Sequence, residues 1–176
     1  YMTNCRLTDP EFERGVKDFL AVCNVVKVFR RTRILQIAPR PFDFWSTMCN
    51  EGELLEKFNI QLSPIPLPEL TAQVKKAKEE GTEVKAVMDY CKEKMNVCVT
   101  EEHLENIAAL KVAMRRLADQ YGCNAVAIQC WNALQGELGI MPCAANSLLN
   151  EEGLPVVCET DIHGAITAVM AEAADL

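Results

Sequence analysis

The chain alternates short, wholly apolar segments with longer segments that carry a helical pattern. Three of the short segments are apolar over enough consecutive residues to form buried strands. They lie at 33–38, 123–129 and 154–158, and a shorter candidate lies at 60–62. Strands that are apolar on both faces and separated by helices are typical of a parallel sheet covered by helices on both sides. We therefore predict an open, doubly wound α/β domain of the Rossmann-like class.

The segments between the strands place apolar side chains at steps of three and four residues, as helices do. Their ends carry ordinary helix signals: Pro10 follows Asp9, Thr100 precedes two glutamates, and Gly122 follows the last apolar residue of its segment. The predicted helices span 10–30, 50–58, 68–80, 82–95, 100–121, 141–150 and the segment from 163 to the end of the chain.

The composition excludes several classes of partner. The 176 residues are 49% hydrophobic and 24% charged, with a formal net charge of −7, which fits one globular domain. The acidic balance argues against a nucleic-acid backbone as partner. No apolar run approaches the ~20 residues of a membrane helix, and no signal segment opens the chain. We expect a cytoplasmic protein with neither a nucleic-acid nor a membrane partner.

Nine cysteines are spread along the chain, and none forms a C-x-x-C pair. Their spacings do not match a usual zinc knuckle. Several lie inside apolar runs, where a thiol behaves as a small hydrophobic group. We predict reduced, mostly buried cysteines in place of a disulfide framework, in keeping with a cytoplasmic protein.

Polar and aromatic residues follow three of the predicted strands directly. In a parallel sheet the carboxyl ends of the strands share one edge, and ligands bind in a crevice there. We therefore expect these residues to line a common crevice. They are Arg40, Phe42, Asp43 and Trp45 after the first strand, Gln129, Cys130, Trp131 and Asn132 after the third, and Glu159, Thr160, Asp161 and His163 after the last.

The last of these segments carries two carboxylates, Glu159 and Asp161, two residues apart. At a strand end they could bind a hard cation such as Mn²⁺ or Mg²⁺ and move a proton. A bound metal also lowers the pKa of hydroxyl groups on a polyol. The alternative is structural: Asp161 caps the final helix and Glu159 is a solvated loop residue. The residues alone leave both interpretations open.

Other polar residues near the strand ends also have two interpretations. His163 is either a metal ligand or a structural residue at the start of a helix. Trp131 could stack on the face of a sugar or belong to the core. Arg40 could bind an anion or lie at the surface. Glu137 and the charged stretch 75–85 fit solvated helix faces.

Two longer motifs resemble a known enzyme family. They are A-V-A-I-Q-C-W at 125–131 and M-P-C-A-A-N-S-L-L-N-E-E-G-L-P-V-V-C-E-T-D-I-H-G-A at 141–165. Both resemble the L-fucose isomerase family, which is related to the L-arabinose isomerases. The segments R-I-L-Q-I-A-P-R-P-F-D-F-W-S-T and N-E-G-E-L-L-E-K-F-N-I resemble the start of that family's middle domain. The resemblance extends from about residue 30 to the end of the chain.

The resemblance implies an aldose–ketose isomerase that works through an ene-diol, with Mn²⁺ held by a glutamate, an aspartate and a histidine. It assigns Glu159 as metal ligand and proton-transfer base. It places Gln129 and Trp131 near the substrate, and Asp161 and His163 beside the site. The match departs from the family motif in three places: Cys158 stands where Thr is usual, Thr160 where Asn is usual, and Gly164 arrives one residue early.

The resemblance also implies a domain layout. Residues 1–30 would be a connecting helix from a preceding domain, and 31–176 a middle domain that ends just after the Glu159 motif. The C-terminal domain, with the aspartate and histidine ligands, would lie outside the chain. The whole protein would act on a monosaccharide as a homo-oligomer. The isolated chain would bind Mn²⁺ poorly and would not isomerise sugars.

Two other functions remain open from the sequence. The chain could be a non-catalytic sugar-binding α/β module, or a domain whose surface mainly assembles an oligomer. A nucleotide-binding version has less support, because neither a G-x-G-x-x-G motif nor a phosphate-binding loop is present in the sequence.

Overall fold

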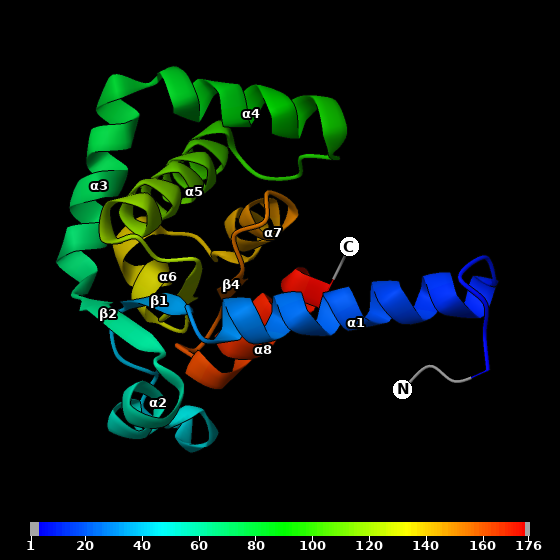
Figure 1. Cartoon of the computed structure of the whole chain (residues 1–176). Helices are drawn as coiled ribbons and strands as arrows, with labels where there is room; N and C mark the ends of the chain where they lie inside the picture. The colour runs from blue at the N-terminus through cyan, green and yellow to red at the C-terminus, as the bar shows by residue number, and fades with distance from the viewer. Residues whose placement is uncertain (1–3, 175–176) are drawn as a thin grey trace.

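The computed structural model describes residues 4–174 and shows a sheet surrounded by helices (Figure 1). The strands are β1 (Arg33–Ile37), β2 (Gln61–Ile65), β3 (Ala125–Ile128) and β4 (Val156–Val157). The helices are α1 (Pro10–Phe29), α2 (Glu51–Phe58), α3 (Leu67–Glu80), α4 (Thr82–Lys94), α5 (Glu101–Tyr121), α6 (Ala133–Leu138), α7 (Cys143–Glu151) and α8 (Ile162–Ala174), with a 3-10 turn, η1 (Trp45–Thr47).

All strand pairs in the sheet are parallel, and the strand order is β2-β1-β3-β4. Leu35 of β1 pairs with Ser63 of β2 on one side and with Val126 of β3 on the other. The chain passes from β1 outward to β2 and then returns to β3 on the other side of β1. The strand order therefore reverses between β1 and β3, the position at which open α/β sheets bind ligands. This topology confirms the predicted fold class.

Successive residues of the central strands enter opposite cores, because strand side chains alternate between the two faces of a sheet. Leu35 and Ile128 pack in the larger core, with buried residues of α3, α5 and α7. Ile34 and Ala127 pack in the smaller core, with α2 and α8. All four side chains are fully buried. Helices therefore cover both faces, which explains why these strands are apolar throughout.

Local signals set several helix ends where the sequence predicts them. The Thr100 hydroxyl accepts a hydrogen bond from the His103 amide at 3.2 Å, and the Asn50 side chain accepts one from the Glu53 amide at 3.1 Å. Gly122 ends α5 in the left-handed conformation, with φ of 62°. The predicted continuation of the last helix to Leu176 lies outside the described residues.

Four elements differ from the sequence-based prediction. β2 continues through Pro64 to Ile65, because an edge strand tolerates a proline whose missing amide faces no further strand. β4 has only two residues, Val156 and Val157. The short elements η1 and α6 were not predicted, because segments of three and six residues carry too little periodicity to be recognised.

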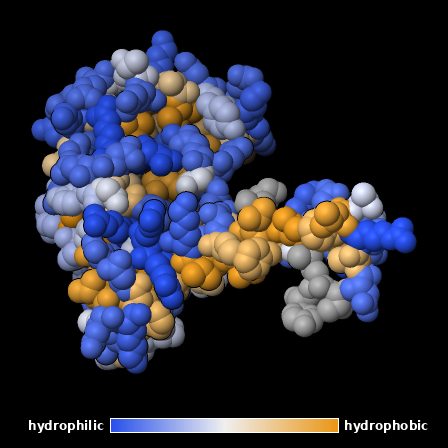
Figure 2. All heavy atoms as spheres, viewed as in Figure 1, coloured by the Kyte–Doolittle hydropathy of each residue, from blue (hydrophilic) through white to orange (hydrophobic). Residues whose placement is uncertain are grey.

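Helix α1 extends away from the sheet and packs against α8 (Figure 1). The Asn24 side chain donates a hydrogen bond to the Ala173 carbonyl at 2.7 Å and joins the two helices. No residue of α1 is buried. Figure 2 shows apolar side chains along its surface, and Phe19, Val22 and Val26 are among the exposed ones.

The nine cysteines are all free thiols, as predicted, but only three of them are buried. Cys23 is exposed although it lies in an apolar run, because α1 is not covered along that face. None of the helices between residues 4 and 174 combines the length and the apolar character needed to cross a membrane.

Candidate functional site

Thr160 brings the carboxyl ends of three strands together. Its amide donates to the carbonyl of Ile128 at 3.1 Å, at the end of β3. Its hydroxyl donates to the carbonyl of Pro39 at 3.2 Å, just after β1. Thr160 itself follows β4 and is only 3% exposed. The segments after β1, β3 and β4 therefore share one edge of the sheet.

The backbone turns sharply where β4 ends. Glu159 and Thr160 both have positive φ angles, 57° and 54°. Left-handed backbone costs a residue with a side chain about 1–2 kcal/mol, and such residues occur often at functional sites. The amide of Asp161 donates to the carbonyl of Cys158 at 3.1 Å and closes the turn. The turn places the Glu159 side chain against the end of β3.

Glu159 lies in a group with two thiols. The Cys130 thiol donates a hydrogen bond to Oε1 of Glu159 with a sulfur–oxygen distance of 3.3 Å. The potential ligand atoms of Cys130, Cys158 and Glu159 all lie within 4.8 Å of one another. Cys130 is buried, whereas the other two are partly exposed.

Burial makes both thiols hard to ionise. It raises the pKa of Cys130. Burial, followed by the negative charges on Cys130 and Glu159, raises the pKa of Cys158 to about 12. At neutral pH both groups are therefore protonated thiols. The sequence singled out Glu159 but did not predict that two thiols lie beside it. Cys130 and Cys158 follow different strands, and only the folded sheet brings them together.

Gln129 and Trp131 lie beside a hollow between the ends of β1 and β3. Its volume is about 480 Å³. Trp131 is half exposed and meets the ring of Phe44 edge to face, with centroids 5.4 Å apart. The backbone amide of Gln129 donates to the Ile37 carbonyl at 3.0 Å and fixes the end of β3 against β1. The hollow is lined by Pro41, Phe42, Asp43, Gln129, Trp131 and Asn132.

Arg40 contacts its own loop. Its guanidinium lies 4.7 Å from the centroid of the Trp45 ring. Its Nη1 donates to the carbonyls of Pro41 and Phe42 at 3.2 and 3.1 Å. These contacts support the loop beside the hollow and fit the surface interpretation of Arg40.

Asp161 and His163 are not part of the ligating group described around Glu159. The Asp161 carboxylate accepts a hydrogen bond from the Gly164 amide at 2.9 Å and caps α8, which is the structural alternative left open by the sequence. His163 is exposed and lines a separate hollow of about 290 Å³ together with Leu54 and Phe58 of α2.

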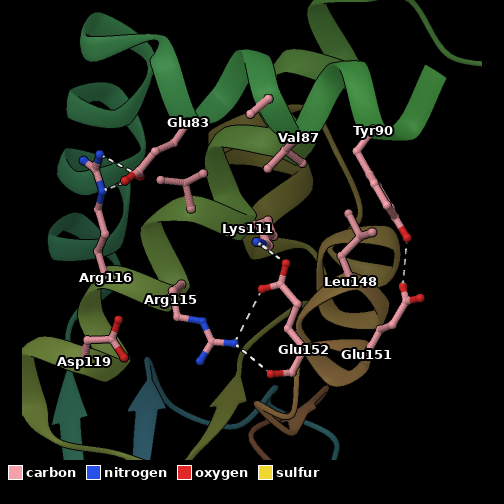
Figure 3. A pocket seen from close by; sticks show the side chains of 12 residues that line it. Glu83, Val87, Tyr90, Lys111, Arg115, Arg116, Asp119, Leu148, Glu151 and Glu152 are labelled. Carbon is pink, nitrogen blue, oxygen red and sulfur yellow. Dashed lines mark hydrogen bonds and ion pairs between the residues drawn. The ribbon is translucent and has the colours of Figure 1, made fainter. Parts of the chain in front are cut away.

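A larger hollow of about 670 Å³ lies elsewhere, between α4, α5 and α7 (Figure 3). Several of its charged residues pair with one another: Lys111 contacts Glu152 at 2.7 Å, and Arg116 contacts Glu83 at 2.8 Å. These side chains lie on helices that precede β3 and β4, away from the strand ends. This hollow is larger than the one beside Trp131. The strand ends joined by Thr160 are nevertheless the better candidate site, because the carboxylate and thiols that could react or bind a metal lie there.

The residues around Glu159 do not make a Mn²⁺ site by themselves. Mn²⁺ prefers six oxygen ligands. Within residues 4–174, the ligating group supplies one carboxylate and two thiols. Mn²⁺ bound at Glu159 would take most of its ligands from outside this group, and no catalytic step through the metal follows from these residues.

The chain is similar to three curated proteins, each named sulfoquinovose isomerase. The protein from Alkalicoccus urumqiensis is 29% identical over 146 residues, which cover 83% of this chain and 33% of the relative. Those from Priestia aryabhattai and Priestia megaterium are each 25% identical over 146 residues, covering 83% of this chain and 32% of each relative. The chain therefore spans about a third of the length of these relatives. No family model matches the chain.

All three relatives are named as isomerases of a sugar. Their names agree with the reaction class expected from the sequence, the isomerisation of a sugar. Membership of the L-fucose isomerase family stays a prediction.

Proposed function

We propose that this chain is the central α/β domain of an aldose–ketose sugar isomerase, with Glu159 as its proton-transfer base. The observation that carries the proposal is the position of Glu159. It lies at the shared edge of three strand ends, beside the reversal in strand order. The similarity to sugar isomerases supports the same reaction class.

The reaction requires one group that removes and returns a proton. In an aldose, the C2 proton leaves to give an ene-diol, and a proton then adds to C1 while a hydroxyl proton moves from O2 to O1. The carboxylate of Glu159 suits both transfers, because C1 and C2 are neighbours and one base can reach each in turn. The Cys130 thiol at 3.3 Å holds the carboxylate in one orientation.

The neighbouring hollow suits the rest of the sugar. The exposed ring of Trp131 can cover an apolar C–H face, as aromatic side chains do with partly polar ligands. The side-chain amide of Gln129 offers both a donor and an acceptor to hydroxyl groups. We propose these two as substrate-binding residues and a monosaccharide as the substrate.

We propose that residues 1–30 connect this domain to a preceding one, and that 31–176 form the middle domain of a longer, homo-oligomeric protein. The Mn²⁺ implied by the family resemblance would take Glu159 from this chain and its other ligands from elsewhere. When bound, such a metal would polarise the sugar oxygens.

The test is Glu159→Gln in the intact protein, which keeps the size of the side chain and removes the base. L-fucose, L-arabinose and sulfoquinovose are offered as substrates. We expect kcat to fall by about 10²–10⁴-fold, the usual contribution of a positioned base, with little change in KM. The matched control is Glu137→Gln, an exposed residue of α6, which should keep the parental rate. Parental kcat/KM in Glu159→Gln would rule out the proposed base.

A second candidate function is assembly, because α1 exposes apolar residues along its length. Phe19 is 65% exposed and Val22 is 60% exposed. In this alternative, α1 binds a second copy of the chain. Light scattering of the purified chain should then show a dimer or larger species that Val22→Glu dissociates and Glu13→Gln does not. A chain that is monomeric at high concentration contradicts this alternative.

The third possibility, a sugar-binding module without catalysis, predicts sugar affinity that EDTA does not change and no isomerisation by the intact protein. Calorimetric titration with the same three sugars, with and without EDTA, separates it from the isomerase.

A further inference from the structure

The group formed by Cys130, Cys158 and Glu159 has a composition that differs from that of a magnesium or manganese site. Two of its three potential ligands are sulfur atoms. Thiolates bind Zn²⁺ strongly, whereas Mn²⁺ and Mg²⁺ prefer oxygen. This donor set therefore suits a softer cation than the one implied by the family resemblance.

The separation between Cys130 and Glu159 is close to that of two ligands on a tetrahedral zinc ion. Zinc–sulfur bonds of about 2.3 Å and zinc–oxygen bonds of about 2.0 Å place two ligand sulfurs about 3.8 Å apart, and a sulfur and an oxygen about 3.5 Å apart. The Cys130 sulfur already lies 3.3 Å from Oε1 of Glu159, and all three ligand atoms lie within 4.8 Å of one another.

Asn146 gives independent support from a different element, α7. It is only 6% exposed, and its Nδ2 donates to the Cys158 sulfur at 3.3 Å. Its Oδ1 is buried and has no hydrogen-bond partner among the described residues. Hydrogen bonds to ligating sulfur are the kind of support that surrounds metal ligands. A metal-bound water would donate to Oδ1 and satisfy it.

We propose that Cys130, Cys158 and Glu159 bind a zinc ion, with water in the fourth position and Asn146 hydrogen-bonded to the site. Binding replaces the two thiol protons, which pass to the solvent. The two thiolates that form on binding and the Glu159 carboxylate then share one divalent cation, which offsets most of the repulsion between them. The site stands on this geometry and does not depend on the isomerase proposal. If Glu159 is the base, zinc occupies it and inhibits the enzyme.

The test uses the reduced, untagged 176-residue chain in oxygen-free buffer, titrated with CoCl₂ as a spectroscopic stand-in for zinc. We expect equimolar binding, a thiolate-to-cobalt charge-transfer band and the intense visible absorption of a tetrahedral site, all displaced by ZnCl₂ but not by MnCl₂. Cys130→Ser and Cys158→Ser should each weaken the charge-transfer band by about half and lower zinc affinity at least tenfold. Cys98→Ser, at an exposed cysteine, should leave both unchanged.

A second measurement protects the test against variants that fail to fold. Zinc should slow the alkylation of Cys130 and Cys158 by iodoacetamide in the parental chain, read by peptide mass spectrometry, while Cys98 reacts at its metal-free rate. Absence of a charge-transfer band in the reduced parental chain, or equal alkylation with and without zinc, overturns the proposal. Formation of a Cys130–Cys158 disulfide in air, by a chain that binds no metal when reduced, also overturns it.

Discussion

At the scale of single residues, Thr160 does the most to assemble the candidate site. It adopts a left-handed backbone, is almost completely buried, and links the ends of β1 and β3 to its own segment after β4. Its sequence context suggested that it lies at the crevice beside the strand ends and that it replaces an asparagine of the resembled motif. The structure gives it a role of its own, because its hydroxyl reaches the carbonyl of Pro39.

Thr160→Val should destabilise the chain by about 1 kcal/mol, because valine keeps the shape but loses the hydrogen bond to Pro39. Thr160→Ser keeps the hydroxyl and should lose less. The free energy of unfolding from urea titration measures both. If the two variants are equally stable, the hydroxyl contributes nothing to the joining of the strand ends.

A second residue-scale prediction concerns pH. Burial raises the pKa of Cys91, a residue of α4 that packs with Leu104 and Leu148. Above about pH 8.5, where an unfolded thiol begins to release its proton, the folded chain retains it. The free energy of unfolding therefore falls as pH rises, by at most about 1.4 kcal/mol per pH unit for this group. Below that pH, both states hold the proton and Cys91 adds no pH dependence.

Cys91→Ala removes the titrating group, so its stability deficit relative to the parent should be larger at pH 7 than at pH 10. Cys98→Ala, at an exposed cysteine, is the control and should show the same small difference at both pH values. Urea titrations at the two pH values give the result. A deficit for Cys91→Ala that does not shrink at pH 10 contradicts the assignment.

At the scale of elements, long helices with clear ends were predictable and short elements were not. α5 has a Thr cap, acidic residues in its first turn, and a glycine after its last turn, so its bounds follow from local chemistry. α6 and β4 have six and two residues, and their conformation depends on neighbours that are distant in the sequence.

Gly122 and Gly136 form a matched pair that tests how a glycine contributes at the end of a helix and inside one. Gly122 ends α5 with φ of +62°, whereas Gly136 lies within α6, and a Cβ at either position meets nothing within 4 Å. Gly122→Ala should therefore cost about 1 kcal/mol from backbone conformation alone. Gly136→Ala should be neutral or stabilising by up to about 1 kcal/mol, because alanine favours a helix interior. Thermal unfolding of both variants checks the opposite signs.

At the scale of the whole molecule, the sheet positions Glu159 at the shared strand edge. The group of potential ligands around it contains a single carboxylate, which is too few oxygen ligands for Mn²⁺. The isolated 176 residues should therefore form no ketose from L-fucose, L-arabinose or sulfoquinovose with Mn²⁺ present. Chromatographic detection of product is the measurement, and the intact protein is the positive control. Ketose formed by the isolated chain would show that its own residues complete the active site.

The sequence by itself determined the long helices, the buried strands and the parallel α/β architecture, because these depend on apolar periodicity and on local signals such as Thr100 and Gly122. It also indicated the segments whose ends would meet, since the carboxyl ends of parallel strands share an edge. Only the tertiary structure decided which side chains touch there. It separated His163 from Glu159, used Asp161 as a helix cap, and placed two cysteines beside Glu159. These outcomes depend on contacts between residues distant in the sequence and on backbone turns with positive φ, which no local pattern encodes.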